Sequence, residues 1–261
     1  MRFEDEGIVL STRVFGENGL VLTLLTHHHG VHKGLLRSKR QHRPFLELGS
    51  HLKVSWNARL SDHLGTWTVE PLYTPISYIL TRALALQALT TACQLIESFL
   101  PEREPQPTCF NSLLALSKGF EVDHWLACYC HLECDIIRAT GLPLDFSQCA
   151  VTNNRDELIY VSPRSGRAVS RDAGEPYKDK LMALPAFLRP MSEACRPTYQ
   201  DIVAAFTLSG YFLERYVLSP HHAKMPLARE RLLELLKCEN LPSIQSFQGQ
   251  EPRQEGDTIP S

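Results

Sequence analysis

Apolar and polar residues alternate along the first part of the chain with the two-residue period of β-strands. The clearest stretch is His51–Leu60, where Leu52, Val54 and Trp56 alternate with polar residues. Five such segments fall within about 65 residues, and most are bounded by glycine, which indicates a small closed barrel rather than a layered sheet. The predicted strands are Gly7–Phe15, Leu20–Thr26, Val31–Arg40, His51–Leu60 and Thr66–Leu72. The natural candidate for residues 1–76 is the OB-fold, a five-stranded barrel.

From Ile79 onward the period changes to that of amphipathic helices, with polar residues every three or four positions. The predicted helices are Ile79–Leu100, Thr108–Lys118, a helix from the N-cap residue Asp123 to Thr140, Tyr199–Leu218 and Pro226–Lys237. Residues 144–175 interrupt this pattern as an irregular insert. The fold class predicted is therefore α+β: an OB barrel, then a helical domain (77–238) that carries the insert. The last segment, 239–261, is rich in Gln, Pro, Glu and Ser, which predicts a disordered tail.

Composition places the chain among ordinary globular proteins. Hydrophobic residues make up 43% of the 261 residues, and no apolar run reaches the length of a membrane span. The N-terminal sequence MRFEDEG is acidic and lacks the apolar region of a signal peptide, so we expect a cytoplasmic protein with no membrane partner. The eight cysteines are spread over a chain too long to need disulfides, which fits a reducing compartment.

Positive charge is concentrated in one segment of a chain whose formal net charge is only −2. Between Val31 and Arg59, seven cations face a single acid, Glu47, which gives a local charge of +6 (seven minus one). The cations are Lys33, Arg37, Lys39, Arg40, Arg43, Lys53 and Arg59. A basic segment on the predicted OB barrel indicates a nucleic-acid interface, and three aromatic residues (Phe45, Trp56 and Trp67) could stack on unpaired bases. The alternative is a solvated basic surface, with Trp56 filling the barrel.

Catalytic and metal-binding motifs are missing from the sequence. There is no phosphate-binding GxxxxGK[ST] or GxGxxG loop, no GxSxG turn and no HExxH helix, so we expect neither an enzyme nor a cofactor. Three consecutive histidines, His27 to His29, would point to alternating faces if the strand continued, which disfavours a metal there. On a helix, Cys128, Cys130, His131 and Cys134 do not converge on one ion, and buried small apolar side chains explain the cysteines better.

Several segments together resemble the RecO family, a family of bacterial recombination mediators, from about Gly7 to Leu236. They are Gly7-Ile8-Val9-Leu10, Phe15-Gly16-Glu17-Asn18, Leu24-Leu25-Thr26, Gly30, Lys33-Gly34, the insert from Cys149 to Val169, and Leu208 to Arg215. The resemblance implies an N-terminal OB domain, a helical C-terminal domain and no catalytic residues. It also implies binding of single- and double-stranded DNA, annealing of complementary strands, and work with RecR and single-stranded DNA-binding protein (SSB) to load RecA on gapped DNA during repair. Such a protein would be found with the nucleoid.

The insert departs from the pattern of some relatives, which carry a four-cysteine zinc site as two CxxC pairs. Here only Cys149 remains, Thr152 stands where its partner would be, and residues 160–175 contain no cysteine. We therefore expect a degenerate zinc-finger region without zinc. A non-catalytic protein–protein adaptor with only incidental DNA affinity is the alternative function.

A second candidate site lies on the helix predicted for Asp123–Thr140. One apolar stripe of this helix consists of Trp125, Tyr129, Leu132, Ile136 and Ala139. The opposite side carries Cys130, Cys134 and Ile137, flanked by the cationic or titratable residues His131 and Arg138. A helix that is apolar on two sides is either central in a bundle or presents one side to a partner. The family resemblance favours a partner, the acidic tail of SSB, on Cys130, His131, Cys134, Ile137 and Arg138.

Overall fold

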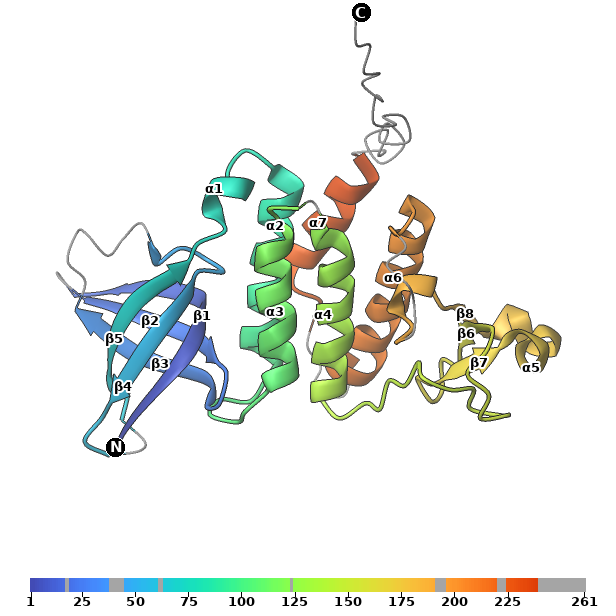
Figure 1. The fold of residues 1–261 in the computed structure, drawn as a ribbon, viewed down its shortest axis with the longest axis horizontal. Coiled ribbons are helices and arrows are strands. Elements are labelled where there is room, and N and C mark those ends of the chain that lie inside the picture. Colours follow the sequence, from blue (N-terminus) through green and yellow to red (C-terminus); the bar gives the residue numbers. More distant parts are fainter. Residues whose placement is uncertain are drawn as a thin grey trace, which may run out of the picture.

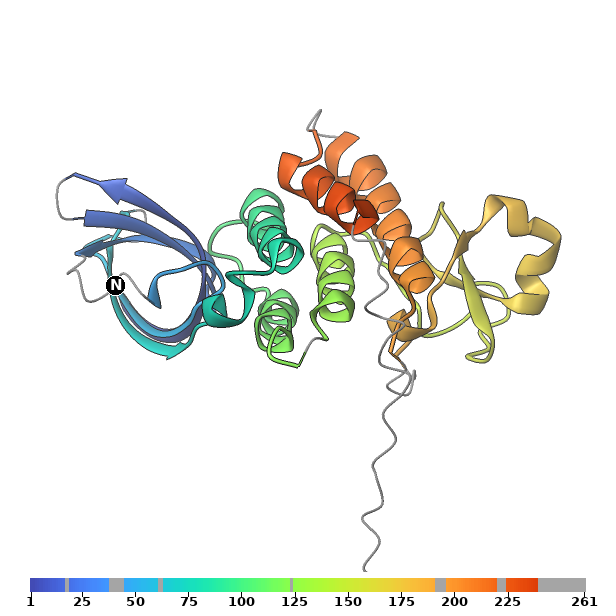
Figure 2. The same cartoon turned by 90° about the horizontal axis from the view of Figure 1, so that it is seen from above.

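A computed structural model describes residues 1–16, 19–37, 45–60, 63–122, 124–190, 196–219 and 224–238. Three parts follow one another along the longest axis of the molecule: a β-barrel, a group of helices, and a small sheet with a short helix (Figure 1). The view from above shows the same order (Figure 2). No helix within the described ranges is both long and apolar enough to cross a membrane.

The barrel is closed in the strand order β1-β2-β3-β5-β4, with β1 pairing to β4, which confirms the predicted five-stranded OB-fold. The strands are β1 (Arg2–Phe15), β2 (Gly19–Thr26), β3 (Gly30–Arg37), β4 (His51–Asn57) and β5 (Thr66–Tyr73). β1 begins earlier than predicted, and β4 ends three residues earlier. β1 is long enough to serve two neighbours: its first half pairs with β4 and its second half with β2, with an irregularity between Val9 and Ser11.

The barrel interior is filled by the alternating apolar residues, because a period of two sends them all to one side of the sheet. The buried interior side chains include Val9, Leu22, Leu24, Leu36, Leu46, Leu52, Val54, Trp56 and Trp67. At the end nearest the helices, Ile8, Leu10, Leu25 and Val31 instead join the core of the helical part. The barrel and the helices therefore share one apolar contact region.

The helical part contains α1 (Ile76–Ile79), α2 (Ala83–Phe99), α3 (Pro107–Gly119), α4 (Trp125–Ala139), α6 (Tyr199–Phe212), the π-helical turn η4 (Leu213–Leu218) and α7 (Leu227–Cys238). The prediction of one helix from Ile79 to Leu100 was wrong at its start, because Arg82 has a non-helical backbone and separates α1 from α2. α4 ends as expected before Gly141, whose positive φ of 98° favours glycine. The proposed N-cap, Asp123, lies outside the described residues.

A buried ion pair joins three of these helices. Glu133 of α4 accepts hydrogen bonds from the Arg229 Nε and Nη2 of α7, at 2.8 and 3.0 Å, and from the hydroxyls of Tyr129 and Ser209. The carboxylate therefore has four charged or polar donors, and although burial opposes it, these contacts hold the pKa of Glu133 below its ordinary value. α4 lies centrally, with contacts to α2, α3 and α6.

The insert is more regular than predicted. It contains β6 (Leu158–Val161), β7 (Ala168–Ser170) and α5 (Arg171–Gly174), and the chain continues through the 3-10 helix η2 (Glu175–Lys180), β8 (Met182–Ala183) and the 3-10 helix η3 (Ala186–Leu188). The three strands form one antiparallel sheet in the order β7-β6-β8. β8 lies beyond the predicted end of the insert, so its pairing with β6 is a tertiary contact that local sequence did not reveal.

Candidate nucleic-acid interface

The outer surface of three consecutive strands carries cations and no acid. Residues that lie directly opposite one another in antiparallel strands share a side of the sheet. The register of β1, β2 and β3 therefore forms three rows: Ser11, Thr23 and Lys33; Arg13, Val21 and Leu35; and Phe15, Gly19 and Arg37. We call these nine residues the β2–β3 face. The paired segments 11–15, 19–26 and 30–37 contain no Asp or Glu, so the face has a charge of +3 from Arg13, Lys33 and Arg37.

The two barrel tryptophans lie inside, not on this face. Trp56 and Trp67 are buried, and their indole nitrogens donate to backbone carbonyls, Trp67 to Leu22 at 3.2 Å. Gly34 makes room for the ring, because a Cβ at this position would stand 2.6 Å from the Trp67 nitrogen. The expectation that Trp56 and Trp67 stack on bases was therefore wrong. Phe45 is half-buried and packs against the same interior.

The end of the β2–β3 face nearest the helices is partly neutralised by two acids of the helical part. Lys33 forms an ion pair with Glu102, and Arg13 approaches Glu97 of α2 at 3.9 Å. Ser11 Oγ also donates to Glu97, at 3.1 Å. A groove of about 710 Å³ lies here, lined by Val9–Arg13, Lys33, Leu46–Leu48, Thr90, Gln94, Glu97 and Ser98. The helices thus set the boundary of the basic surface on this side.

The opposite end of the face remains open. Arg37 is exposed at the end of β3, and within the described part of the chain no carboxylate forms an ion pair with it. Arg59, just after β4, is exposed too. Three of the predicted DNA-binding residues, Lys39, Arg40 and Arg43, lie outside the described residues. Their role in DNA binding remains a prediction from the sequence.

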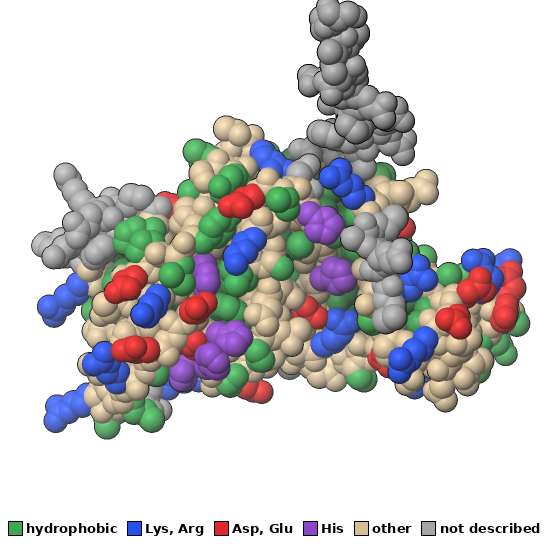
Figure 3. Space-filling model, viewed as in Figure 1, with side chains coloured by type: hydrophobic (Ala, Val, Ile, Leu, Met, Phe, Trp, Pro, Cys, Tyr) green, Lys and Arg blue, Asp and Glu red, His purple; other side chains and the backbone are tan. Residues whose placement is uncertain are grey.

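Lys53 does not belong to this surface. On β4 it lies opposite Glu6 of β1 and Glu70 of β5, so an acid stands on each side of its exposed side chain. Cross-strand neighbours of opposite charge attract each other. Figure 3 views the molecule from the side on which β4 and β5 lie in front, and there red and blue side chains are interspersed over the barrel. The seven predicted cations therefore do not form one basic face.

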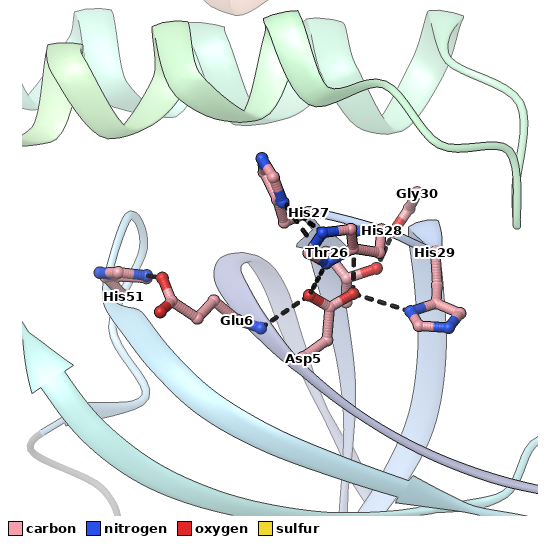
Figure 4. Close-up of polar contacts among 8 residues, drawn as sticks. All are labelled: Asp5, Glu6, Thr26, His27, His28, His29, Gly30 and His51. Carbon is pink, nitrogen blue, oxygen red and sulfur yellow. Dashed lines mark hydrogen bonds and ion pairs between the residues drawn. The ribbon is translucent and has the colours of Figure 1, made fainter.

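The three consecutive histidines form a turn, where the strand does not continue past Thr26. His28 and His29 both place Nδ1 on the carboxylate of Asp5, at 3.0 and 2.7 Å (Figure 4). Burial opposes ionisation of Asp5, but these hydrogen bonds hold its pKa below the ordinary value. His51 bonds Glu6 at 2.8 Å in the same region. The histidines therefore have structural partners, and Figure 3 shows histidine side chains where the barrel meets the helices.

Among the described residues, no group of three or more His, Cys, Asp or Glu side chains is arranged to hold a metal ion. In the insert, Cys149 Sγ accepts hydrogen bonds from the backbone N–H and the hydroxyl of Ser170, at 3.3 and 3.4 Å. Although burial raises it, the pKa of the Cys149 thiol is lowered to about 6 by the hydrogen bonds from Ser170 and Thr152. Cys130 and Cys134 are buried in the helical core, as the sequence suggested.

The predicted peptide site on α4 is largely inside the protein. Cys130, Cys134 and Ile137 are buried, so these three side chains offer a partner no surface, and the interpretation of α4 as a central helix is the correct one. Arg138 remains half-exposed, but it already bonds Asp135 at 2.7 Å and the Leu144 carbonyl at 2.9 Å. His131 is exposed, its ring lies 5.8 Å from that of Phe187, and partial desolvation lowers its pKa.

Exposed residues at the tip of the β1–β2 hairpin were missed from the sequence. Val14 is 81% exposed and Phe15 57% exposed. Arg13, 78% exposed at its side chain, precedes them. The signal in the sequence was the apolar pair Val14 and Phe15, directly before Gly16. Both residues are exposed because the hairpin extends beyond the part of the barrel that has an interior.

Comparison with known proteins identifies similar sequences along nearly the whole chain. Residues 1–74 match the family model "Recombination protein O N terminal", and residues 81–225 match "Recombination protein O C terminal". A curated "DNA repair protein RecO" of Rhodospirillum centenum is 40% identical over 238 residues, which cover 90% of this chain and 94% of that protein. Proteins of the same name from Rhodospirillum rubrum (41%, covering 91% and 97%) and Caulobacter vibrioides (40%, covering 90% and 98%) are similar to the same extent.

Proposed function

Because this chain belongs to the RecO family of DNA repair proteins, we propose that it binds single- and double-stranded DNA on the β2–β3 face and anneals complementary strands. With RecR and SSB it would then promote the loading of RecA on gapped DNA. The observation that supports this most is the combination of an OB barrel with three strands that carry cations and no acid on their shared outer surface. In OB-folds, the face of strands 2 and 3 and the loop between strands 1 and 2 commonly bind oligonucleotides.

Annealing follows from charge neutralisation. Two DNA strands repel each other through their phosphates, and each phosphate that meets a lysine or arginine releases a bound counterion. A face that takes up phosphates from both strands lowers their repulsion and leaves the bases free to pair. In this mechanism base pairing completes the reaction, and no side chain of the protein makes or breaks a covalent bond. The protein acts as a mediator, localised with the nucleoid by its affinity for DNA.

We propose a contact with the acidic SSB tail that involves fewer residues than the sequence suggested. Only His131 and Arg138 of the five predicted residues are accessible. The pKa of His131 is lowered, so its positive charge is lost at a lower pH than that of an ordinary imidazole. At neutral pH the attraction for an acidic tail on α4 therefore comes from Arg138. Arg138→Glu is expected to abolish binding of a labelled tail peptide while leaving affinity for bare DNA unchanged.

One experiment distinguishes the proposed function from the alternative, an adaptor with incidental DNA affinity. Charge reversal of Arg37, Lys39 and Arg40 removes three predicted phosphate contacts. At 0.1 M salt each contact with single-stranded DNA contributes roughly a factor of five to affinity, so we expect a loss of at least about 100-fold, together with loss of annealing. Fluorescence anisotropy with a labelled oligonucleotide and an annealing assay measure both. An adaptor would keep its full activity in this variant.

A further inference from the structure

The tip of the β1–β2 hairpin holds an aromatic ring that the barrel leaves uncovered. Six aromatic residues other than histidine belong to the described barrel, and five of them are buried or half-buried: Phe3, Phe45, Trp56, Trp67 and Tyr73. Phe15 is the exception, with 57% of its surface exposed. In Figures 1 and 2 the ends of β1 and β3 and the start of β2 lie at the far end of the barrel from the helices. The helical part therefore does not cover this ring.

The row that contains Phe15 has a glycine in its middle position. Across the three strands the register is Phe15, Gly19 and Arg37, so the residue between the ring and the guanidinium contributes no side chain of its own. The nearest side chain is that of Leu35, whose Cδ1 would stand 3.2 Å from a Cβ at Gly19. Two strand spacings separate Phe15 from Arg37, a span of about 10 Å between their backbones. That span leaves space for one flat aromatic group between the ring and the guanidinium. A larger residue would not fit at Gly19, since a Cβ there would stand 2.6 Å from the Phe15 carbonyl oxygen.

The positive charge near Phe15 indicates which kind of ligand binds at the ring. Arg37 closes the row of Phe15 itself, so a cation stands on that side of the ring, whereas Arg13 in the neighbouring row approaches Glu97 at 3.9 Å. A ligand that is flat, apolar on its faces and attached to anions fits this arrangement. Unpaired bases on a phosphate backbone have these properties, and every base can stack on an aromatic ring or on a guanidinium. Glu17 and Asn18, which follow in sequence, lie outside the described residues.

We propose that Phe15 is a stacking residue for single-stranded DNA, with one unpaired base held between its ring and the guanidinium of Arg37. This inference rests on the proposed function and extends it, because a stacking residue would make the same face bind unpaired strands more tightly than paired ones. In a duplex the faces of the bases are already covered by their neighbours, so the Phe15 ring has nothing to stack on. The cations, in contrast, attract the phosphates of both forms.

The test measures the binding of five variants of the full chain to oligonucleotides in single- and double-stranded form. Phe15→Ala is expected to weaken single-strand binding about tenfold, within the range measured for loss of one base stack, and to leave duplex affinity within twofold. Phe15→Leu keeps the apolar volume without the aromatic face and should behave like Phe15→Ala, whereas Phe15→Tyr should restore binding. Val14→Ala is the matched control, because Val14 is even more exposed than Phe15, 81% against 57%, but lies on the other side of the hairpin. A 2-aminopurine base in the oligonucleotide should be quenched by the wild-type protein and much less by Phe15→Leu.

Equal single-strand affinity of wild type and Phe15→Ala would overturn the stacking role, and so would full binding by Phe15→Leu. If DNA affinity is unchanged but the oligomeric state of Phe15→Ala differs in gel filtration, the ring belongs to a contact between copies of the chain and the proposal is wrong. Loss of binding in Arg37→Ala, with Phe15→Ala unaffected, would reject only the stacking role. Failure of the wild-type chain to bind any oligonucleotide would reject the proposed function as well.

Discussion

The two sides of the barrel are built from the same strand, β1, yet they differ in charge. The second half of β1 pairs with β2 and contributes to the β2–β3 face, where three cations meet no acid on the strands. The first half pairs with β4, and its Glu4 and Glu6, with Glu70 of β5, share the outer surface with Arg2 and Lys53. The second surface therefore has a charge of −1 (two cations minus three acids). The proposed DNA path therefore follows only the first surface, because cross-strand register, rather than the local density of lysine and arginine in the sequence, decides which cations share a face.

The largest difference in DNA affinity is expected between two double variants, each of which reverses two charges on one side of the barrel. Arg13→Glu with Arg37→Glu removes two cations from the β2–β3 face, and we expect single-strand affinity to fall at least about 25-fold at 0.1 M salt. Arg2→Glu with Lys53→Glu changes the net charge of the chain by the same amount on the other side. Since exposed charges are screened beyond about 10 Å, this matched variant should stay within about twofold. Similar losses in both variants, measured by fluorescence anisotropy, would show that only net charge matters.

The two sides of the barrel enclose the same apolar interior, and the stability of the barrel is expected to depend on pH. His32 lies inside the barrel, with its ring 4.6 Å from that of Trp56, and desolvation lowers the pKa of His32 below the ordinary 6.5. The unfolded chain therefore takes up this proton at a higher pH than the folded barrel. Stability is fully present above pH 6.5 and falls as the pH decreases, by up to about 1.4 kcal/mol per pH unit for this group. His51, whose pKa is also lowered by desolvation, adds in the same direction.

Urea unfolding of wild type and His32→Phe at pH 7.5 and 5.5 measures this effect. We expect the variant to lose a smaller part of its free energy of unfolding between the two pH values. Identical pH dependence in both proteins would mean that His32 is protonated as readily in the folded barrel as in the unfolded chain.

A smaller change in DNA affinity is expected from a variant at Glu102, where the helical part borders the β2–β3 face. Glu102→Gln removes the acid that pairs with Lys33, so Lys33 becomes available to a phosphate. We expect about a fivefold gain in single-strand affinity at 0.1 M salt, the contribution of one released counterion. Glu104→Gln, two residues away, removes the same charge from another exposed acid and serves as the control. Equal gains in both variants would indicate a general charge effect instead of competition for Lys33.

The sequence predicted the barrel well because its signals are local. Period-two alternation and glycine-bounded turns located all five strands, and the helical period located the main helices. The same signals could not show that Lys53 would lie between Glu6 and Glu70, because these residues come from three strands separated by up to 64 positions in sequence (70 minus 6). Nor could they decide between the two interpretations of α4, as a central helix or as a helix that presents one side to a partner, since whether its second apolar side is covered depends on which helices lie against it. Phe15 was missed because its exposure depends on how far the hairpin extends beyond the barrel interior.

The salt dependence of binding tests the central claim, that DNA follows the β2–β3 face, most directly. The logarithm of the affinity for a single-stranded oligonucleotide is plotted against the logarithm of salt concentration for wild type, Arg37→Ala and Lys53→Ala. If the three cations of the β2–β3 face act together with the predicted contacts Lys39, Arg40, Arg43 and Arg59, about five to seven phosphates are bound. The wild-type slope should then lie near −3.5 to −5, and Arg37→Ala should flatten it by about 0.7. Lys53→Ala should leave the slope unchanged, because Glu6 and Glu70 already flank this lysine. A wild-type slope near zero, or a slope that flattens in Lys53→Ala and not in Arg37→Ala, would contradict the account.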